Sequence, residues 1–156
     1  MTRETEKKIR AAGILLFVIY LALLTYLLFF AENYGRLEIT GYRMNLMPLR
    51  EIRRFLGGRQ VLGNWPVFLN VYGNVLLFVP FGAILPLLHR NNRRFLPVLA
   101  SGALFSVCVE AAQLLSRRGS CDVDDVLLNT LGTAAGYLLF ALCNAIRRRG
   151  LNGKES

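Results

Sequence analysis

Four long runs of low charge dominate the chain and limit what it can fold into. They cover residues 11–31, 70–88, 95–115 and 126–146, and Glu110 is the one charged residue inside them. About 20 apolar residues span the hydrocarbon core of a bilayer as a helix. The sequence therefore predicts an all-α fold, a polytopic membrane protein with a four-transmembrane-helix bundle and one domain over residues 1–156. The first run is too long for a signal-peptide core, so we expect it to be retained.

The basic residues lie between these runs. A net charge of +9 could indicate nucleic-acid binding, but that function needs a basic face on a soluble domain, and no segment is left to build one. With a cytoplasmic N-terminus, eleven Lys and Arg residues lie on the cytoplasmic side and eight on the other. The positive-inside rule therefore favours both termini in the cytoplasm.

The first connection, residues 32–69, is long and contains a short amphipathic pattern. Leu49, Ile52, Phe55 and Leu56 recur at helical spacing, arginines occupy the other faces, and Gly57 ends the run. This pattern predicts a short helix over 48–56 that lies on the membrane surface. Two interpretations stay open: plain anchoring near anionic headgroups, or a basic wall for a specific anionic lipid.

Polar residues gather where three of the predicted spans begin or end. The pairs are Asn70 and Asn74, Glu110 and Gln113, and Asp125 and Asn129. Each pair is spaced i, i+3 or i, i+4 and therefore shares one helix face. Because consecutive spans alternate in direction, all three pairs are expected at the same end of the bundle.

The polar stripe of the fourth span continues into a pair of glycines. Asp125, Asn129, Gly132 and Gly136 fall on one face, and the Gly132-xxx-Gly136 spacing lets a neighbouring helix approach closely. We therefore expect this stripe to point into the bundle and not at lipid.

The candidate site combines these residues with the acidic and basic residues of the third connection. It comprises Asn70, Asn74, Glu110, Gln113, Arg117, Arg118, Asp122, Asp124, Asp125 and Asn129. Three interpretations compete: an interhelical hydrogen-bond network, a binding site for a lipid headgroup, peptide or cation, and catalysis. For catalysis the candidates are Glu110 and Asp125, and Asp122, Asp124 and Asp125 are the candidate ligands of a divalent cation such as Mg²⁺. No other cofactor is predicted.

Residue types absent from this end narrow the chemistry. His89 is the only histidine and lies in the opposite connection, so no serine or cysteine nucleophile can have a histidine partner in the cluster. An enzyme here would have to use carboxylates, arginines or a metal. The three cysteines form no metal-binding or disulfide pattern. Four spans are few for a transporter unless several copies of the chain associate, so the formation of a homo-oligomer stays open.

The order and spacing of these motifs resemble the VanZ-like family. They are Asn45-Leu46-Met47-Pro48, the segment from Asn70 to Gly82, Glu110-xx-Gln113, and the segment from Arg118 to Gly136. The resemblance implies a small integral membrane protein of the bacterial cytoplasmic membrane, in a family named for a member linked to teicoplanin resistance. Six positions match the family motifs: Glu110, Gln113, Asp122, Asp124, Asp125 and Asn129.

We therefore expect an envelope protein that binds a lipid-linked cell-wall intermediate or a lipoglycopeptide at an outward-facing acidic and amide cluster. Such binding would lower sensitivity to teicoplanin-type glycopeptides, without enzymatic turnover. The alternative is a membrane-embedded hydrolase or transferase that acts on a lipid headgroup with carboxylates or a metal.

Overall fold

The computed structural model describes residues 3–29, 44–57, 64–88, 94–116 and 121–152. Its elements, in chain order, are α1 (Arg3–Phe29), β1 (Met44–Asn45), α2 (Arg50–Gly57), α4 (Asn64–Leu88), α5 (Phe95–Leu115), β2 (Cys121–Asp122) and α6 (Val123–Asn152). The four long helices each contain a stretch that is long and apolar enough to cross a membrane. The all-α, four-span prediction is confirmed, and the chain is a multi-pass membrane protein.

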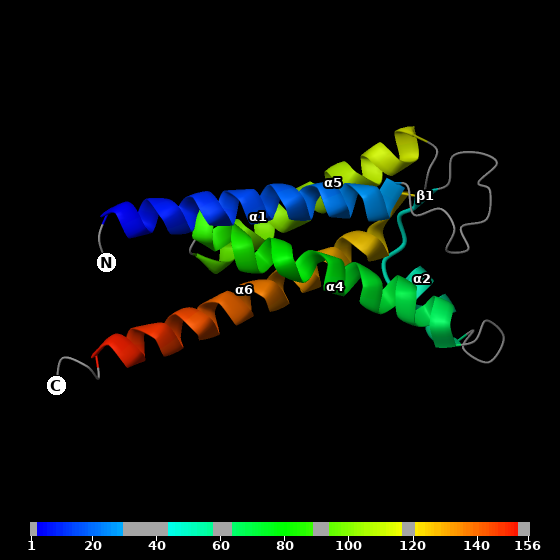
Figure 1. Cartoon of the computed structure of the whole chain (residues 1–156). Coiled ribbons are helices and arrows are strands. Elements are labelled where there is room, and N and C mark those ends of the chain that lie inside the picture. The colour runs from blue at the N-terminus through cyan, green and yellow to red at the C-terminus, as the bar shows by residue number, and fades with distance from the viewer. Residues whose placement is uncertain (1–2, 30–43, 58–63, 89–93, 117–120, 153–156) are drawn as a thin grey trace.

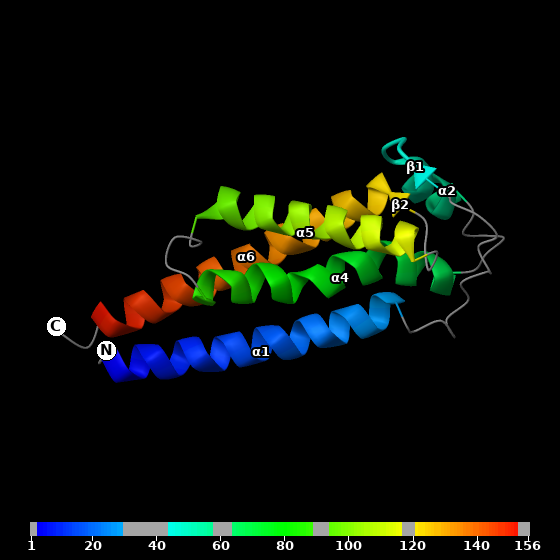
Figure 2. The same ribbon diagram turned by 90° about the horizontal axis from the view of Figure 1, so that it is seen from above.

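The four long helices lie side by side and alternate in direction along the chain. Both termini lie at one end of the bundle, and β1, α2 and β2 lie at the opposite end (Figures 1 and 2). The two strands pair in parallel, with Met44 opposite Cys121 and Asn45 opposite Asp122. The first connection is therefore tied to the start of α6 far along the sequence.

The helices extend beyond the predicted spans. The structure begins α1 at Arg3, α4 at Asn64 and α6 at Val123, and α6 continues to Asn152. Backbone hydrogen bonds do not depend on apolar side chains, so a helix can continue past the bilayer core into polar sequence. The third span matches its predicted bounds, and α2 begins two residues later than predicted and ends at Gly57.

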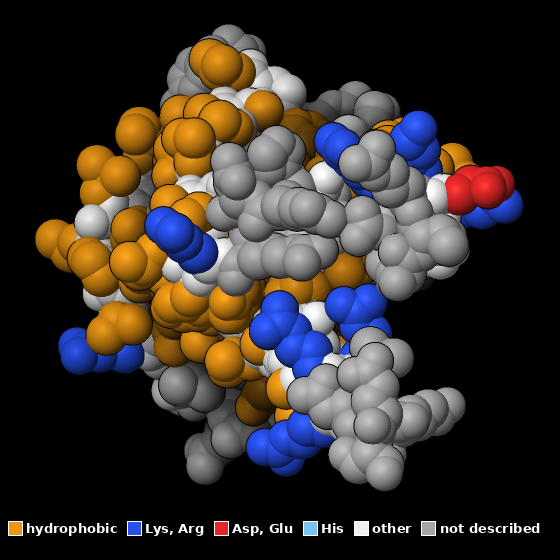
Figure 3. Space-filling view, turned by 90° about the vertical axis from the view of Figure 1, so that its left-hand side faces the viewer, with side chains coloured by type: hydrophobic (Ala, Val, Ile, Leu, Met, Phe, Trp, Pro, Cys, Tyr) orange, Lys and Arg blue, Asp and Glu red, His pale blue; other side chains and the backbone are white. Residues whose placement is uncertain are grey.

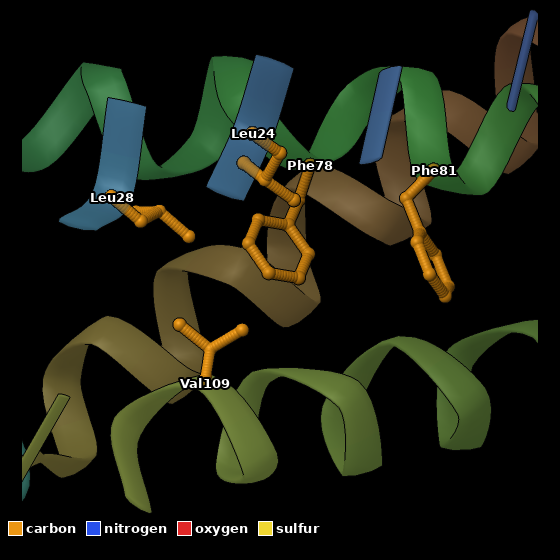
Figure 4. Close-up of a cluster of buried hydrophobic side chains, with 5 residues drawn as sticks. All are labelled: Leu24, Leu28, Phe78, Phe81 and Val109. Atoms are coloured by element: carbon orange, nitrogen blue, oxygen red, sulfur yellow. The ribbon is translucent and has the colours of Figure 1, made fainter. Parts of the chain in front are cut away.

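A small apolar core joins α1, α4 and α5. Leu24, Leu28, Phe78, Phe81 and Val109 form one buried cluster, in which Leu24, Leu28, Phe78 and Val109 point into a common space and Phe81 lies beside Phe78 (Figure 4). The hydroxyl of Tyr20 adds a polar link, because it donates to the main-chain oxygen of Leu77 over 2.8 Å. Within the bundle such a hydroxyl needs a partner, since no water is available in the hydrocarbon core.

Glycines bring α4 and α6 into backbone contact. A Cβ added at Gly132 would lie 2.1 Å from the carbonyl oxygen of Val75, and one at Gly136 would lie 2.0 Å from that of Val79. A Cβ added to Gly82 on α4 would lie 2.0 Å from the carbonyl oxygen of Thr133. The prediction that the Gly132-xxx-Gly136 stripe is a helix-packing surface is confirmed.

Candidate functional site

Asp122 begins the last helix and holds the first connection at the same time. Its Oδ1 atom accepts a hydrogen bond from the backbone N–H of Asp124 at 2.8 Å, the arrangement of an N-cap. The same oxygen accepts from the Asn45 amide at 3.1 Å. The Asn45 Oδ1 atom in turn accepts from the N–H of Met47 at 3.3 Å. Both side chains are buried.

Asp124 caps a helix that lies 72 residues earlier in the chain. Its Oδ2 atom accepts from the N–H of Ile52 at 3.2 Å, and its Oδ1 atom accepts from the N–H of Leu49. Ile52 lies in the first turn of α2, whose N–H groups have no partner inside the helix, and Leu49 directly precedes that turn. Leu49 has a φ of 65°, a left-handed conformation that costs a residue with a branched side chain free energy. The carboxylate of Asp124 holds this turn in place.

Glu110 completes this arrangement from α5. Its Oε2 atom accepts from the backbone N–H of Asp122 at 3.0 Å. Relative exposures of 3% for Glu110, 6% for Asp122 and 1% for Asp124 place all three carboxylates inside the protein. We call Asn45, Glu110, Asp122 and Asp124 the loop clamp, because together they bind the first connection to the ends of α5 and α6.

The fourth carboxylate, Asp125, differs from these three. It is only half-buried, and its Oδ1 atom accepts from the Asn74 amide of α4 at 2.5 Å. Asn74 is half-buried as well. Of the four predicted acids, Asp125 is therefore the one that a ligand from outside can reach most easily, and the amide of Asn74 fixes its direction.

The remaining predicted amides make contacts inside the bundle. Gln113 donates to the carbonyl oxygen of Leu28 near the end of α1 at 3.2 Å, and Asn129 donates to the Ser106 hydroxyl at 2.9 Å. Thr133 donates to the main-chain oxygen of Asn129 at 3.0 Å. The Oδ1 atom of Asn129 is buried, with no hydrogen-bond partner among the described residues. The expected convergence is therefore present, but most of its members face the protein interior.

Sequence reasoning missed three polar residues of this region. Ser106 and Thr133 are fully buried: Ser106 links α5 to α6 through Asn129, and Thr133 packs against Gly102 of α5. Asn45 carries the contact with the first connection. The signal for Asn45 was its place in the Asn-Leu-Met-Pro motif. Arg117 and Arg118 lie outside the described residues, as does the side chain of Asn70.

The aspartates of the third connection point to different partners. Asp122 binds Asn45, Asp124 binds the backbone of residues 49 and 52, and Asp125 binds Asn74. In the part of the chain that the structure describes, no group of three His, Cys, Asp or Glu side chains is arranged to hold a metal ion. A divalent cation at this end stays a prediction, with Asp125 as its most exposed candidate ligand.

Cys121 lies beside the loop clamp in β2. Burial raises the pKa of its thiol above the ordinary value, and the negative charges of Glu110 and Asp122 raise it further. All three cysteines, Cys108, Cys121 and Cys143, are free thiols. Cys121 is therefore a chemical reporter for this end of the molecule.

Comparison with known proteins agrees with the motif order. The sequence profile of the VanZ/LLP1 family matches residues 17–144. Protein VanZ of Enterococcus faecium is 31% identical over 140 residues, which cover 88% of this chain and 77% of that protein. No solved structure matches this chain. The matched region includes the second half of α1, all of α4 and α5, most of α6 and the whole candidate site.

Proposed function

Since the chain belongs to the VanZ/LLP1 family, we propose that it binds a lipid-linked or glycopeptide ligand in the bacterial cell envelope. Binding occurs at the end of the bundle opposite the termini and lowers sensitivity to teicoplanin-type glycopeptides. The protein lies in the cytoplasmic membrane, with both termini in the cytoplasm and the Asn74–Asp125 pair facing outward.

The half-buried Asn74–Asp125 pair is the observation that supports this proposal. The three buried carboxylates are already occupied by groups of the protein itself, so recognition falls to the carboxylate that remains partly exposed. An ionised carboxylate beside an amide donor can accept hydrogen bonds from hydroxyl, amide or ammonium groups of a glycopeptide or a lipid headgroup. It can also bind such a ligand through a divalent cation.

The distribution of basic residues supports the proposed orientation. Figure 3 looks at the end of the bundle that carries both termini and shows Lys and Arg side chains spread over it. The described basic residues near this end are Lys7, Lys8, Arg10, Arg94, Arg147, Arg148 and Arg149. Over the whole sequence, eleven Lys and Arg residues belong to the side of the termini and eight to the opposite side, and an excess of this sign favours the cytoplasmic side.

Replacing Asp125 with asparagine tests the ligand site. We expect the variant to fold and to lose about 10–100-fold in ligand affinity, because a hydrogen bond to a charged group contributes about 1.5–3 kcal/mol. In a sensitive host, protection against teicoplanin should fall to that of the empty vector. Asn144→Ala, at the other end of α6, is the control and should protect as well as the parent protein. Full protection by both Asp125→Asn and Asn74→Ala, at equal expression, would contradict the proposal.

The same pair supports a second candidate function, hydrolysis or transfer on a lipid headgroup. A half-buried carboxylate held by an amide is a suitable general base, and Glu110 would act as a positioning residue through Asp122. A turnover assay with envelope lipids separates the two functions. Turnover that Asp125→Asn abolishes while ligand binding persists would favour the enzyme, and repeating it with a chelator tests the divalent cation.

Alkylation of Cys121 tests the orientation. In a Cys108→Ser, Cys143→Ser background, a membrane-impermeant maleimide should label Cys121 in intact cells. An Arg149→Cys probe, with Cys121 also changed to serine, should react only after permeabilisation. Because the thiolate is the reactive form and the pKa of Cys121 is raised, labelling of Cys121 at pH 8 should be slower than that of a thiol with an ordinary pKa. The labelling rate of Cys121 should continue to rise as the pH is raised above about 8.5, the pKa of an unperturbed thiol. The reverse labelling pattern would place the termini outside.

A further inference from the structure

The docked part of the first connection presents large apolar side chains on its surface. Leu46 is 69% exposed and Met47 is 66% exposed, and Met44 and Leu49 are also exposed. We call these four residues the apolar ridge. Most exposed apolar residues of this protein lie on the long helices, where lipid chains surround them. The ridge lies outside those helices, so it needs a separate account.

The loop clamp fixes the ridge in one conformation. Hydrogen bonds to Asn45 and Asp124 hold the backbone at Met47, Leu49 and Ile52, and β1 pairs with β2. Asp122 and Asp124 are almost fully buried beneath it. A surface that is held in place in this way can bind a partner without a large loss of conformational entropy.

The position and charge of the ridge indicate what covers it. Met44 lies in β1 and Leu46 follows it, and β1 pairs with β2 directly before α6. Helix α5, which ends at the exposed Leu115, contacts β2. The ridge therefore continues the lipid-facing surface at the depth where the bilayer core ends. Arg50 and Arg53 follow it directly and are exposed. Apolar side chains next to arginines are typical of segments that enter an anionic headgroup layer.

We propose that the apolar ridge inserts into the headgroup layer of an anionic lipid leaflet, with Arg50 and Arg53 against the lipid phosphates. The lipid-contacting element is then the turn that precedes α2, and the buried carboxylates set its depth beside the Asn74–Asp125 pair. This interaction requires no glycopeptide and stands apart from the proposed function.

Tryptophan fluorescence in nanodiscs tests this placement. Trp65 is the only tryptophan, so Trp65→Phe provides a background for Leu46→Trp. In phosphatidylglycerol nanodiscs, lipids brominated near the glycerol end should quench Leu46→Trp at least about twofold more than lipids brominated near the chain ends. Glu4→Trp, in the first turns of α1, is the control and should show little quenching. Adding Arg50→Gln and Arg53→Gln should reduce the quenching of the Leu46→Trp tryptophan toward its value in phosphatidylcholine nanodiscs. Adding Arg147→Gln should leave that quenching unchanged.

A second probe guards against a background that does not fold. A nitroxide on Met47→Cys, with the three native cysteines changed to serine, should be more accessible to oxygen than to a water-soluble nickel complex. Strong quenching of Leu46→Trp by aqueous iodide, together with high nickel accessibility at residue 47, would overturn the proposal. The ridge could also be shielded from iodide and nickel only when a nanodisc holds more than one protein. That result would show that a second copy of the chain covers the ridge, and it would overturn the proposal as well.

Discussion

Replacing Gly82 with alanine is expected to lower the free energy of unfolding by about 2–3 kcal/mol. The added methyl group would meet the carbonyl oxygen of Thr133, which lies 2.0 Å from the position of the new Cβ. Neither helix backbone can move aside without opening the contacts at Gly132 and Gly136, and overpacking of a tight core typically costs about 1–3 kcal/mol. Unfolding of the purified protein in mixed micelles with increasing SDS measures the loss.

Gly73→Ala is the matched control, because it makes the same substitution on the same helix. A Cβ at Gly73 meets nothing within 4 Å. Alanine has a higher helix propensity than glycine by about 1 kcal/mol, so this variant should be equally stable or more stable. Equal unfolding midpoints for Gly82→Ala and the parent protein would show that α4 and α6 do not pack through these glycines.

Replacing Asp124 with alanine is expected to release the first connection from the bundle. The change removes the acceptor for the N–H groups of Leu49 and Ile52. Both N–H groups are part-buried, so each loses less than the about 1–3 kcal/mol of a fully buried donor, and losing a helix cap costs about 0.5–2 kcal/mol. We expect a total loss of about 2–4 kcal/mol. Trypsin cleavage after Arg50 and Arg53 should become at least about tenfold faster, because cleavage requires local unfolding.

Asp125→Ala separates this effect from a general loss of charge at the helix start. Its described hydrogen bond joins it to the half-buried side chain of Asn74. We expect it to change stability by about 1 kcal/mol and to leave the trypsin pattern unaltered. If Asp124→Ala gave the same slow cleavage as Asp125→Ala, the capping role assigned to Asp124 would be wrong.

The sequence predicted the helices and their packing because those features are local. Four apolar runs are enough to specify four membrane helices, and the spacing of Gly132 and Gly136 identifies a packing surface without knowledge of its partner. Alternating directions then place Asn74, Glu110 and Asp125 at one end. Only the helix ends differ from the prediction, since polar residues outside the bilayer continue the same hydrogen-bond pattern.

The role of each polar residue in the cluster could not be predicted from local sequence patterns. A two-residue strand has no periodicity, and a pairing between Asn45 and Asp122 leaves no mark in a single sequence. In the sequence, nothing distinguishes the roles of the three aspartates at positions 122, 124 and 125. In the structure Asp122 caps α6, Asp124 caps α2, and Asp125 stays half-buried beside Asn74. The difference arises from which backbone N–H groups lie nearby, and that depends on tertiary structure.

The contact between Asn45 and Asp122 has a consequence for biogenesis. The ribosome makes the chain from its N-terminus, and 77 positions separate the two partners. Three hydrophobic segments have therefore been synthesised before the partner of Asn45 exists. Segment 44–57 therefore cannot dock until residues 121–124 have been synthesised, so this end of the protein cannot mature before the fourth membrane segment begins. A chain halted before residue 121 would retain three membrane segments and would never complete that end.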